Sequence, residues 1–171
     1  MTQVLISLVE IARLRRDPSV LPASLTLLVT MAVAYAGSSA MQSWLLHQGD
    51  RLLARTVADL ALTLAIFWVV LAVTRRLYRY RQTMNAVLGV SVLLTPILML
   101  LIALQQPTDM YYAIKLMAWA GSIAVIVWYT LVIGHILKSA LEIGFVTSVA
   151  IAITTVIAAN AVLGKLFPVT A

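Results

Sequence analysis

The chain has 171 residues, of which 63% are apolar and only 11% are charged. Soluble domains are about 45–50% apolar and about 25% charged, so a water-soluble fold of this size has too little interior for so much apolar surface. Intrinsic disorder is excluded because disordered chains are poor in apolar residues. The absence of cysteine excludes disulfides, thiolate zinc sites and cysteine nucleophiles. The composition therefore predicts an integral membrane protein built as one compact domain.

The first sixteen residues are predicted to form a separate amphipathic helix. Apolar residues recur there at helical spacing, at Val4, Leu5, Leu8, Val9 and Ala12. The stretch is too short and too charged to span a bilayer, so we expect it to lie on the cytoplasmic leaflet, with a frayed tail as the alternative. The pair Asp17-Pro18 then predicts the start of a new helix, because aspartate favours the N-cap and proline the first helical position.

Five stretches are long and apolar enough to be transmembrane helices, each of which needs roughly 20 mostly apolar residues. The predicted spans are residues 22–45, 57–74, 83–104, 111–137 and 143–163. The predicted fold class is therefore all-α, an integral membrane helical bundle. It divides into an N-terminal cytoplasmic helix (residues 1–17), a five-helix membrane domain (18–167) and a short extracytoplasmic tail (168–171). The connections are short, so consecutive helices are expected to be antiparallel neighbours.

The positive charges predict the orientation. Eight lysines and arginines precede the first span or follow the second and fourth spans, against four on the other side. An excess of basic residues marks the cytoplasmic side, so we expect the N-terminus inside and the C-terminus outside. Nine arginines against three lysines are typical of a GC-rich bacterial genome, which favours a bacterial inner membrane. Basic residues at membrane borders meet anionic lipid headgroups, so the charge needs no nucleic-acid partner. The expected headgroup ligands are Arg75, Arg76, Arg79 and Arg81.

Two acidic residues near helix starts are predicted to be caps. Asp59 follows Thr56 by three positions, and Glu142 follows Ser139 by three, which is the spacing of a capping box. The helix dipole also favours negative charge at these positions. If both carboxylates cap helices, neither is expected to act as a proton relay.

Two basic residues in the fourth span have structural and functional interpretations. Lys115 lies about one turn into the helix and is expected to extend its ammonium to the outer headgroups, with pairing to Asp109 or Asp59 as the alternative. His135 lies near the cytoplasmic end, where the dipole favours a cation, and a proton-handling or ligand-binding histidine is the alternative. The two histidines of the chain fall on opposite sides, so no metal site is expected.

Neutral polar residues are predicted to serve packing. Asn85 and Asn160 lie within or near spans, where such amides commonly form interhelical hydrogen bonds. Pro96 removes a backbone bond in the third span and should kink it, with Ser91 and Thr95 available to satisfy the freed groups. The kink is expected to adjust packing, and the alternative is that it lines a cavity.

Small residues recur every four positions on two helices, which lets helix backbones approach closely. One row lies in the first span and the other in the fifth, and each could pack within the chain or between protomers. The rows are Ala32, Ala36 and Ala40, and Gly144, Ser148 and Ala152.

The third and fourth spans contain runs of residues that point to a family of membrane proteins. In the third span, Tyr80-Arg81-Gln82-Thr83 leads into Ala86-Val87-Leu88-Gly89 and then Pro96. The fourth span carries Val127-Trp128-Tyr129-Thr130-Leu131-Val132-Ile133-Gly134-His135. With these runs the chain resembles the Yip1 family of small five-span membrane proteins. The resemblance covers roughly Arg75 to Leu163 and implies a five-span membrane protein of the prokaryotic type. Val90 stands where the family often has an aromatic residue, and the Tyr-Gly-Pro element of the eukaryotic trafficking members is absent.

No catalytic constellation appears in the sequence. There is no nucleophile elbow, no phosphate-binding loop and no histidine pair for haem, so we expect neither an enzyme nor a cofactor. The leading hypothesis is a scaffold or accessory subunit that acts through lipids, other membrane proteins or self-association.

Two alternative functions stay open. The first is an oligomeric transporter or channel that uses Asp59, Asn85, Lys115 and His135 beside the Pro96 kink. The second is a lipid-binding protein that uses the basic loop from Arg75 to Arg81.

Overall fold

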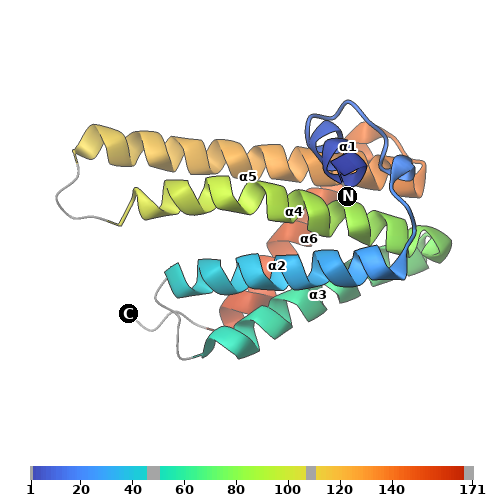
Figure 1. Ribbon diagram of the computed structural model, residues 1–171, viewed down its shortest axis with the longest axis horizontal. Helices are drawn as coiled ribbons and strands as arrows, with labels where there is room; N and C mark the ends of the chain where they lie inside the picture. The colour runs from blue at the N-terminus through green and yellow to red at the C-terminus, as the bar shows by residue number, and fades with distance from the viewer. Residues whose placement is uncertain (1, 46–50, 107–110, 168–171) are drawn as a thin grey trace.

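A computed structural model describes residues 2–45, 51–106 and 111–167, and this part of the chain is almost entirely helical (Figure 1). The long helices are α1 (Thr2–Ala12), α2 (Leu25–Leu45), α3 (Leu52–Val73), α4 (Tyr80–Ala103), α5 (Tyr112–Leu141) and α6 (Phe145–Leu166). Two 3-10 turns, η1 (Pro18–Val20) and η3 (Leu77–Arg79), precede α2 and α4. The predicted all-α fold is confirmed. The predicted tail 168–171 lies outside the described residues.

Helices α2 to α6 are long and apolar enough to cross a membrane, so the chain is an integral membrane protein. Each runs antiparallel to the next, and the bundle therefore has two distinct ends (Figure 1). We call the end with residues 75–81 and the α5–α6 turn the arginine-rich end. We call the other end, where α2, α4 and α6 finish, the far end.

The helices extend beyond the apolar stretches that predict them. Helix α3 begins at Leu52 rather than at residue 57, and α5 continues to Leu141 rather than stopping at residue 137. Charged residues such as Arg55 and Lys138 end a hydrophobic run, but they do not end a helix, because the backbone hydrogen bonds continue into the polar region.

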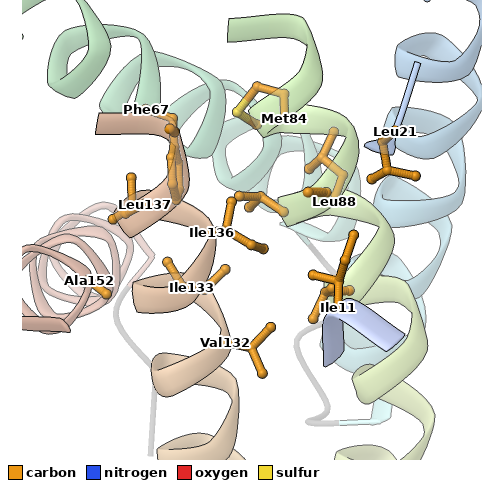
Figure 2. Close-up of a cluster of buried hydrophobic side chains, with 14 of the residues drawn as sticks. Ile11, Leu21, Phe67, Met84, Leu88, Val132, Ile133, Ile136, Leu137 and Ala152 are labelled. Carbon is orange, nitrogen blue, oxygen red and sulfur yellow. The ribbon is translucent and has the colours of Figure 1, made fainter. Parts of the chain in front are cut away.

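The buried apolar core lies in the half of the bundle next to the arginine-rich end. Figure 2 shows part of this cluster of side chains. In the described part of the far half, the buried apolar side chains are Met99, Ala118 and Leu163. The bundle is thus densely packed at one end and less so at the other. The packed half includes Phe67, Leu71, Met84, Leu88, Ile133, Ile136 and Leu137, all less than 5% exposed.

Small residues let α5 and α6 approach closely in this packed half. A Cβ atom added at Gly134 would lie 2.6 Å from Cγ2 and 3.0 Å from Cα of Val149. Ser148 and Ala152, two of the three residues in the predicted α6 row, are fully buried inside the chain. At the third residue, Gly144, an added Cβ atom would have no neighbour within 4 Å.

The row on α2 is half-buried within the same chain. Its members are Ala32, Ala36 and Ala40, and Ala32 packs against the core. Both rows therefore already have partners within a single copy, at least in part.

The predicted N-terminal helix α1 is confirmed, and it packs against α4 and α5 (Figure 1). Its place on the cytoplasmic leaflet stays a prediction. Leu8 and Ile11 are 1% and 0% exposed, and Leu8 occupies the space left by the missing side chain of Gly89. Leu5 and Val9 remain exposed, so the apolar residues of α1 divide between a bundle-facing side and an outer side. A frayed tail is therefore ruled out.

Asp17 caps a helix as predicted, since its Oδ1 accepts a hydrogen bond from Ser19 N at 2.8 Å. Pro18 takes the first position of that helix. The helix is the three-residue turn η1, however, and not the start of the first span. A second proline, Pro22, precedes α2, which begins only at Leu25.

Candidate functional site

A cavity of about 460 Å³ lies among α2 to α6 in the less densely packed half. Its lining reaches from Ser91 and Tyr129, near the middle of the bundle, to Gln42 and Gln105 at the far end. About half of the lining residues are polar. Among the described residues they present hydroxyl groups, three amides and one carboxylate, that of Asp59.

Short side chains on α4 and α5 create this space. Ser91, Thr95 and Ser122 face it, and each donates a hydrogen bond to a carbonyl one turn earlier on its own helix, at 2.7–2.9 Å. Such bonds let a hydroxyl sit inside a helical bundle without an unsatisfied proton. In the packed half the corresponding positions carry larger residues such as Ile133 and Ile136, which fill the interior. The cavity therefore ends where the large apolar side chains begin.

Asp59 is the charged residue of the cavity, and its predicted role as a helix cap is wrong. Helix α3 begins at Leu52, so Asp59 lies two turns inside it, beyond the free backbone N–H groups. Its supposed capping partner Thr56 is buried, with an Oγ1 that finds no partner in the described chain. Because the charged residue Arg55 ends the apolar run, the sequence pattern places the start of the helix after it, whereas the helix begins before it.

The carboxylate of Asp59 is held instead by α2. Its Oδ2 accepts hydrogen bonds from Tyr35 Oη at 3.0 Å and from Ser39 Oγ at 2.7 Å. Tyr35 Oη also lies 3.5 Å from Thr63 Oγ1. Tyr35 and Ser39 are spaced by one helical turn, so both reach the same carboxylate oxygen from one face of α2.

No described cation neutralises Asp59. The ion pairs found in the described chain belong to Glu10 and Glu142, and no basic residue is among those lining the cavity. Lys115 is half-buried near the start of α5 and is not among the lining residues, so its alternative pairing with Asp59 is not found. Its other proposed partner, Asp109, lies outside the described residues.

Amide side chains lie in the part of the cavity next to the far end. Gln105 donates to Leu101 O at 3.0 Å and to Ser122 Oγ at 2.9 Å, which joins α4 to α5. Asn160 lines the cavity and donates to Val156 O of its own helix at 2.8 Å. The interhelical bond predicted for Asn160 is thus absent from the described structure.

The other candidate amide, Asn85, lies in the packed half and holds the N-terminal segment. Its Nδ2 donates to Pro22 O at 2.9 Å, and the neighbouring Gln82 donates to Leu21 O at 2.8 Å. Carbonyls of a non-helical segment need donors when water is excluded, and these amides supply them. Asn85 therefore has the packing role predicted for it, with a loop rather than a helix as its partner.

His135 has a similar partner. Its Nε2 lies 3.1 Å from Arg16 O, and Trp128, two turns earlier on α5, donates from Nε1 to Ala12 O at 3.0 Å. His135 and Asn85 are thus separated from Asp59 and Asn160, and the four residues do not form one site. The first two serve the N-terminal segment, and the second two line the cavity.

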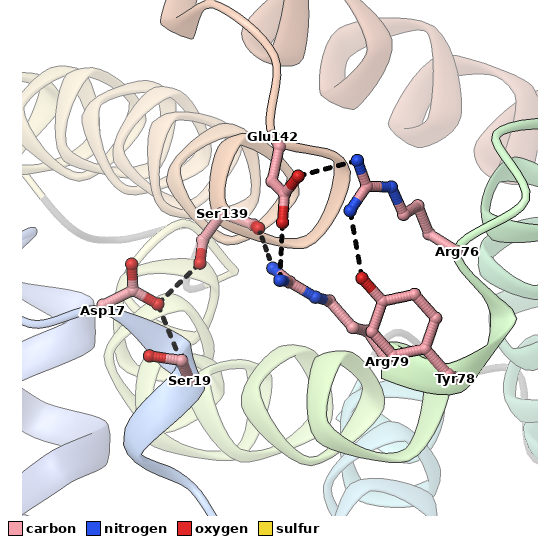
Figure 3. Close-up of polar contacts among 7 residues, drawn as sticks. All are labelled: Asp17, Ser19, Arg76, Tyr78, Arg79, Ser139 and Glu142. Atoms are coloured by element: carbon pink, nitrogen blue, oxygen red, sulfur yellow. Dashed lines mark hydrogen bonds and ion pairs between the residues drawn. The ribbon is translucent and has the colours of Figure 1, made fainter.

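Ion pairs hold the arginine-rich end together (Figure 3). Glu142 lies 2.6 Å from both Arg76 and Arg79, and the hydrogen bond from Arg76 is the main cause that lowers the pKa of Glu142 below its ordinary value. The predicted cap is again wrong, because α6 starts after Gly144 and Glu142 lies outside it at φ 55°. The residue ends α5 in the left-handed region and turns its carboxylate toward the arginines.

Asp17 ties the N-terminal segment to the same end of the bundle (Figure 3). Ser139 Oγ donates to its Oδ1 at 2.5 Å. Partial burial by itself raises the pKa of Asp17, but the hydrogen bonds from Ser139 and Ser19 outweigh it and leave the pKa lowered. A second cavity of about 470 Å³ lies beside these groups and includes His135 and Lys138 in its wall.

The basic loop predicted to bind lipid headgroups divides into two pairs. Arg76 and Arg79 are engaged with Glu142, whereas Arg75 and Arg81 are exposed. In the sequence the four arginines are equivalent, because their neighbour Glu142 lies more than sixty positions away along the chain.

The sequence pattern missed several residues of the cavity, including Tyr35, Ser39, Gln105 and Ser122. The available signal was a concentration of hydroxyl and amide side chains within otherwise apolar spans. No family model, curated protein or solved structure matches this chain. Proposals about its function therefore rest on its own geometry.

Proposed function

We propose that this protein binds a small polar solute inside the membrane, in the cavity that contains Asp59. The single observation that supports this most is a carboxylate at membrane depth that faces a cavity and has no described cation as partner. A charge within a span is costly, and such residues typically mark a substrate or ion pathway. The packed half, with Phe67 and Ile133 next to the cavity, would be the barrier on the other side.

The proposed direction of access follows from the charges. The far end would be extracytoplasmic under the positive-inside rule, so the solute would enter from outside a bacterial inner membrane. Five helices contain no complete inverted repeat, so a transport cycle would need a second copy or a partner protein. The protein would then be a transporter or the solute-binding subunit of a larger assembly.

The scaffold function suggested by the sequence remains a prediction, as does membership of the Yip1 family. The scaffold hypothesis was motivated by the structural explanation of the polar residues, by the small-residue rows and by the short loops. Ser148 and Ala152 are already buried inside one copy, so the row on α6 offers little free surface for a partner. The cavity therefore gives solute binding the stronger support.

Labelling of introduced cysteines tests the proposal cleanly, because the native chain contains none. Thr155 lines the cavity and is 8% exposed, whereas its neighbour Thr154 faces outward from the same helix. In a membrane, Thr155→Cys should react with a small, charged, membrane-impermeant thiol reagent. The control Thr154→Cys should not react, because a thiol in lipid stays protonated.

The side of access is measured in sealed vesicles with Arg81→Cys as a marker of the arginine-rich end, where this residue is exposed. The proposal expects Thr155→Cys and Arg81→Cys to be labelled from opposite sides. Labelling of both from one side, or no reaction at Thr155→Cys from either side, would overturn it.

A further inference from the structure

We infer that the ligand of this cavity is a small organic cation whose charged nitrogen lies against Asp59 and whose apolar part lies against the aromatic and aliphatic wall. This inference rests on the proposed function and names its ligand class. The carboxylate, the absence of described basic residues in the lining, the composition of the wall and the volume each contribute to it.

The charge of the lining favours a cation over an anion. Asp59 is the one acidic residue in the described lining, and the other polar groups there are hydroxyls and amides. Coulomb interactions grow as water is excluded, so a single carboxylate sets the sign of the field in a cavity of this kind. An anion would be repelled, and a neutral solute would leave the carboxylate unneutralised.

The hydrogen bonding of Asp59 leaves an oxygen for the ligand. Both donors from α2, Tyr35 and Ser39, bind Oδ2. Oδ1 receives no hydrogen bond from the described residues. It is also not one of the fully buried side-chain atoms among them that lack a partner, so Oδ1 keeps some accessible surface. The two donors fix the carboxylate in place, while its second oxygen is left to face the positive charge of a ligand.

The wall favours an organic cation over a bare metal ion. Tyr129 and Phe67 contribute aromatic side chains, and Leu94 and Leu98 contribute aliphatic surface. Aromatic faces attract organic ammonium groups, whereas Ca²⁺ and Mg²⁺ require several oxygen ligands with more than one carboxylate as a rule. Within the described residues, no group of three acidic or histidine side chains could hold a metal ion.

The size of the cavity agrees with this assignment. Its volume of about 460 Å³ is within the range of small-molecule sites, roughly 300–1,000 Å³, and far exceeds a single ion. A molecule that fills it would contact both Asp59 and the apolar wall.

Two thiol reagents of similar size and opposite charge test the sign of the field. In the Thr155→Cys protein, the trimethylammonium-ethyl methanethiosulfonate should react faster than the sulfonatoethyl reagent, after each rate is divided by its rate with free cysteine. We expect a preference of about tenfold or more for the cation. In Asp59→Asn, which keeps the size and the acceptor oxygen, the corrected ratio should fall to near one.

A competition experiment keeps Asp59 in place, so it also decides the matter if Asp59→Asn does not fold. Tetramethylammonium chloride should slow labelling of Thr155→Cys, and sodium chloride at the same concentration should not. Equal protection by sodium would overturn the organic ligand in favour of an inorganic ion. The absence of protection by tetramethylammonium would likewise count against the inference.

The outcomes separate the two proposals. Failure of both reagents to reach Thr155→Cys contradicts the solute cavity itself. Reaction with both at a corrected ratio near one leaves the cavity intact and overturns its cation preference.

Discussion

Asn85 and Asn160 carry the same side chain in two transmembrane helices, and the structure gives them different partners. Asn85 is fully buried and donates to a carbonyl of another segment, whereas Asn160 bonds only within its own helix among the described residues. We expect Asn85→Ala to lower the free energy of unfolding by about 1 kcal/mol, since it removes the hydrogen bond that ties α4 to the carbonyl of Pro22. Asn160→Ala should cost about 0.5 kcal/mol or less.

Unfolding of the two variants in mixed micelles measures this difference. Each variant is compared with the native chain under the same detergent conditions. Equal losses in the two variants would contradict the assigned role of Asn85.

Gly134 has a similar matched control at the residue scale. An added methyl group would meet the backbone of Val149, so Gly134→Ala must push α5 and α6 apart, at a cost of about 1–3 kcal/mol. Gly37 has open space at the same point, and Gly37→Ala should be neutral or stabilising. The thermal unfolding midpoint in detergent distinguishes them. A midpoint for Gly134→Ala at or above that of the native chain would show that α5 and α6 are not in close contact.

At the scale of the element, α1 is a docked helix whose attachment depends on its inner side. Leu8 is 1% exposed and Leu5 is 52% exposed on the same helix. Leu8→Ala should therefore destabilise the docking of α1 by about 2–4 kcal/mol, and Leu5→Ala should have little effect.

Hydrogen exchange of the amides in residues 3–12 reports that docking directly. Faster exchange in Leu8→Ala but not in Leu5→Ala is the expected result. Similar exchange in both variants would mean that α1 is not held by the bundle.

The connection between α5 and α6 has a pH dependence with a definite sign. The pKa of Glu142 lies below its ordinary value of 4.5 in the folded chain, because Arg76 and Arg79 favour the charged form. The ion pairs therefore stabilise the fold above the unfolded-state pKa, and this stabilisation is lost as the pH falls through the folded-state value.

Thermal unfolding of Glu142→Gln tests this behaviour. At about pH 7 the variant should unfold at a lower temperature than the native chain. The difference between the two unfolding temperatures should be smaller at about pH 3.5. A gap that is constant with pH would argue against a role for the charge of Glu142.

At the scale of the whole molecule, the apolar runs were sufficient to predict five antiparallel helices and the N-terminal helix. The caps at Asp59 and Glu142 were predicted wrongly because spacing along the chain shows only local partners. Their true partners, Tyr35 and Arg76, are far away in sequence. The cavity was likewise invisible, since it depends on which short side chains of different helices face one another.

On the proposed function, one half of the bundle is packed and the other contains a water-accessible cavity. A series of single cysteines along the inner face of α5 measures this directly. Ser122, Val125 and Tyr129 line the cavity, whereas Ile136 and Ala140 belong to the packed half. Reaction with a small cationic thiol reagent should be fast at the first three positions and undetectable at the last two. Reaction at Ile136→Cys as fast as at Ser122→Cys, or no reaction at any of the five positions, would contradict the account.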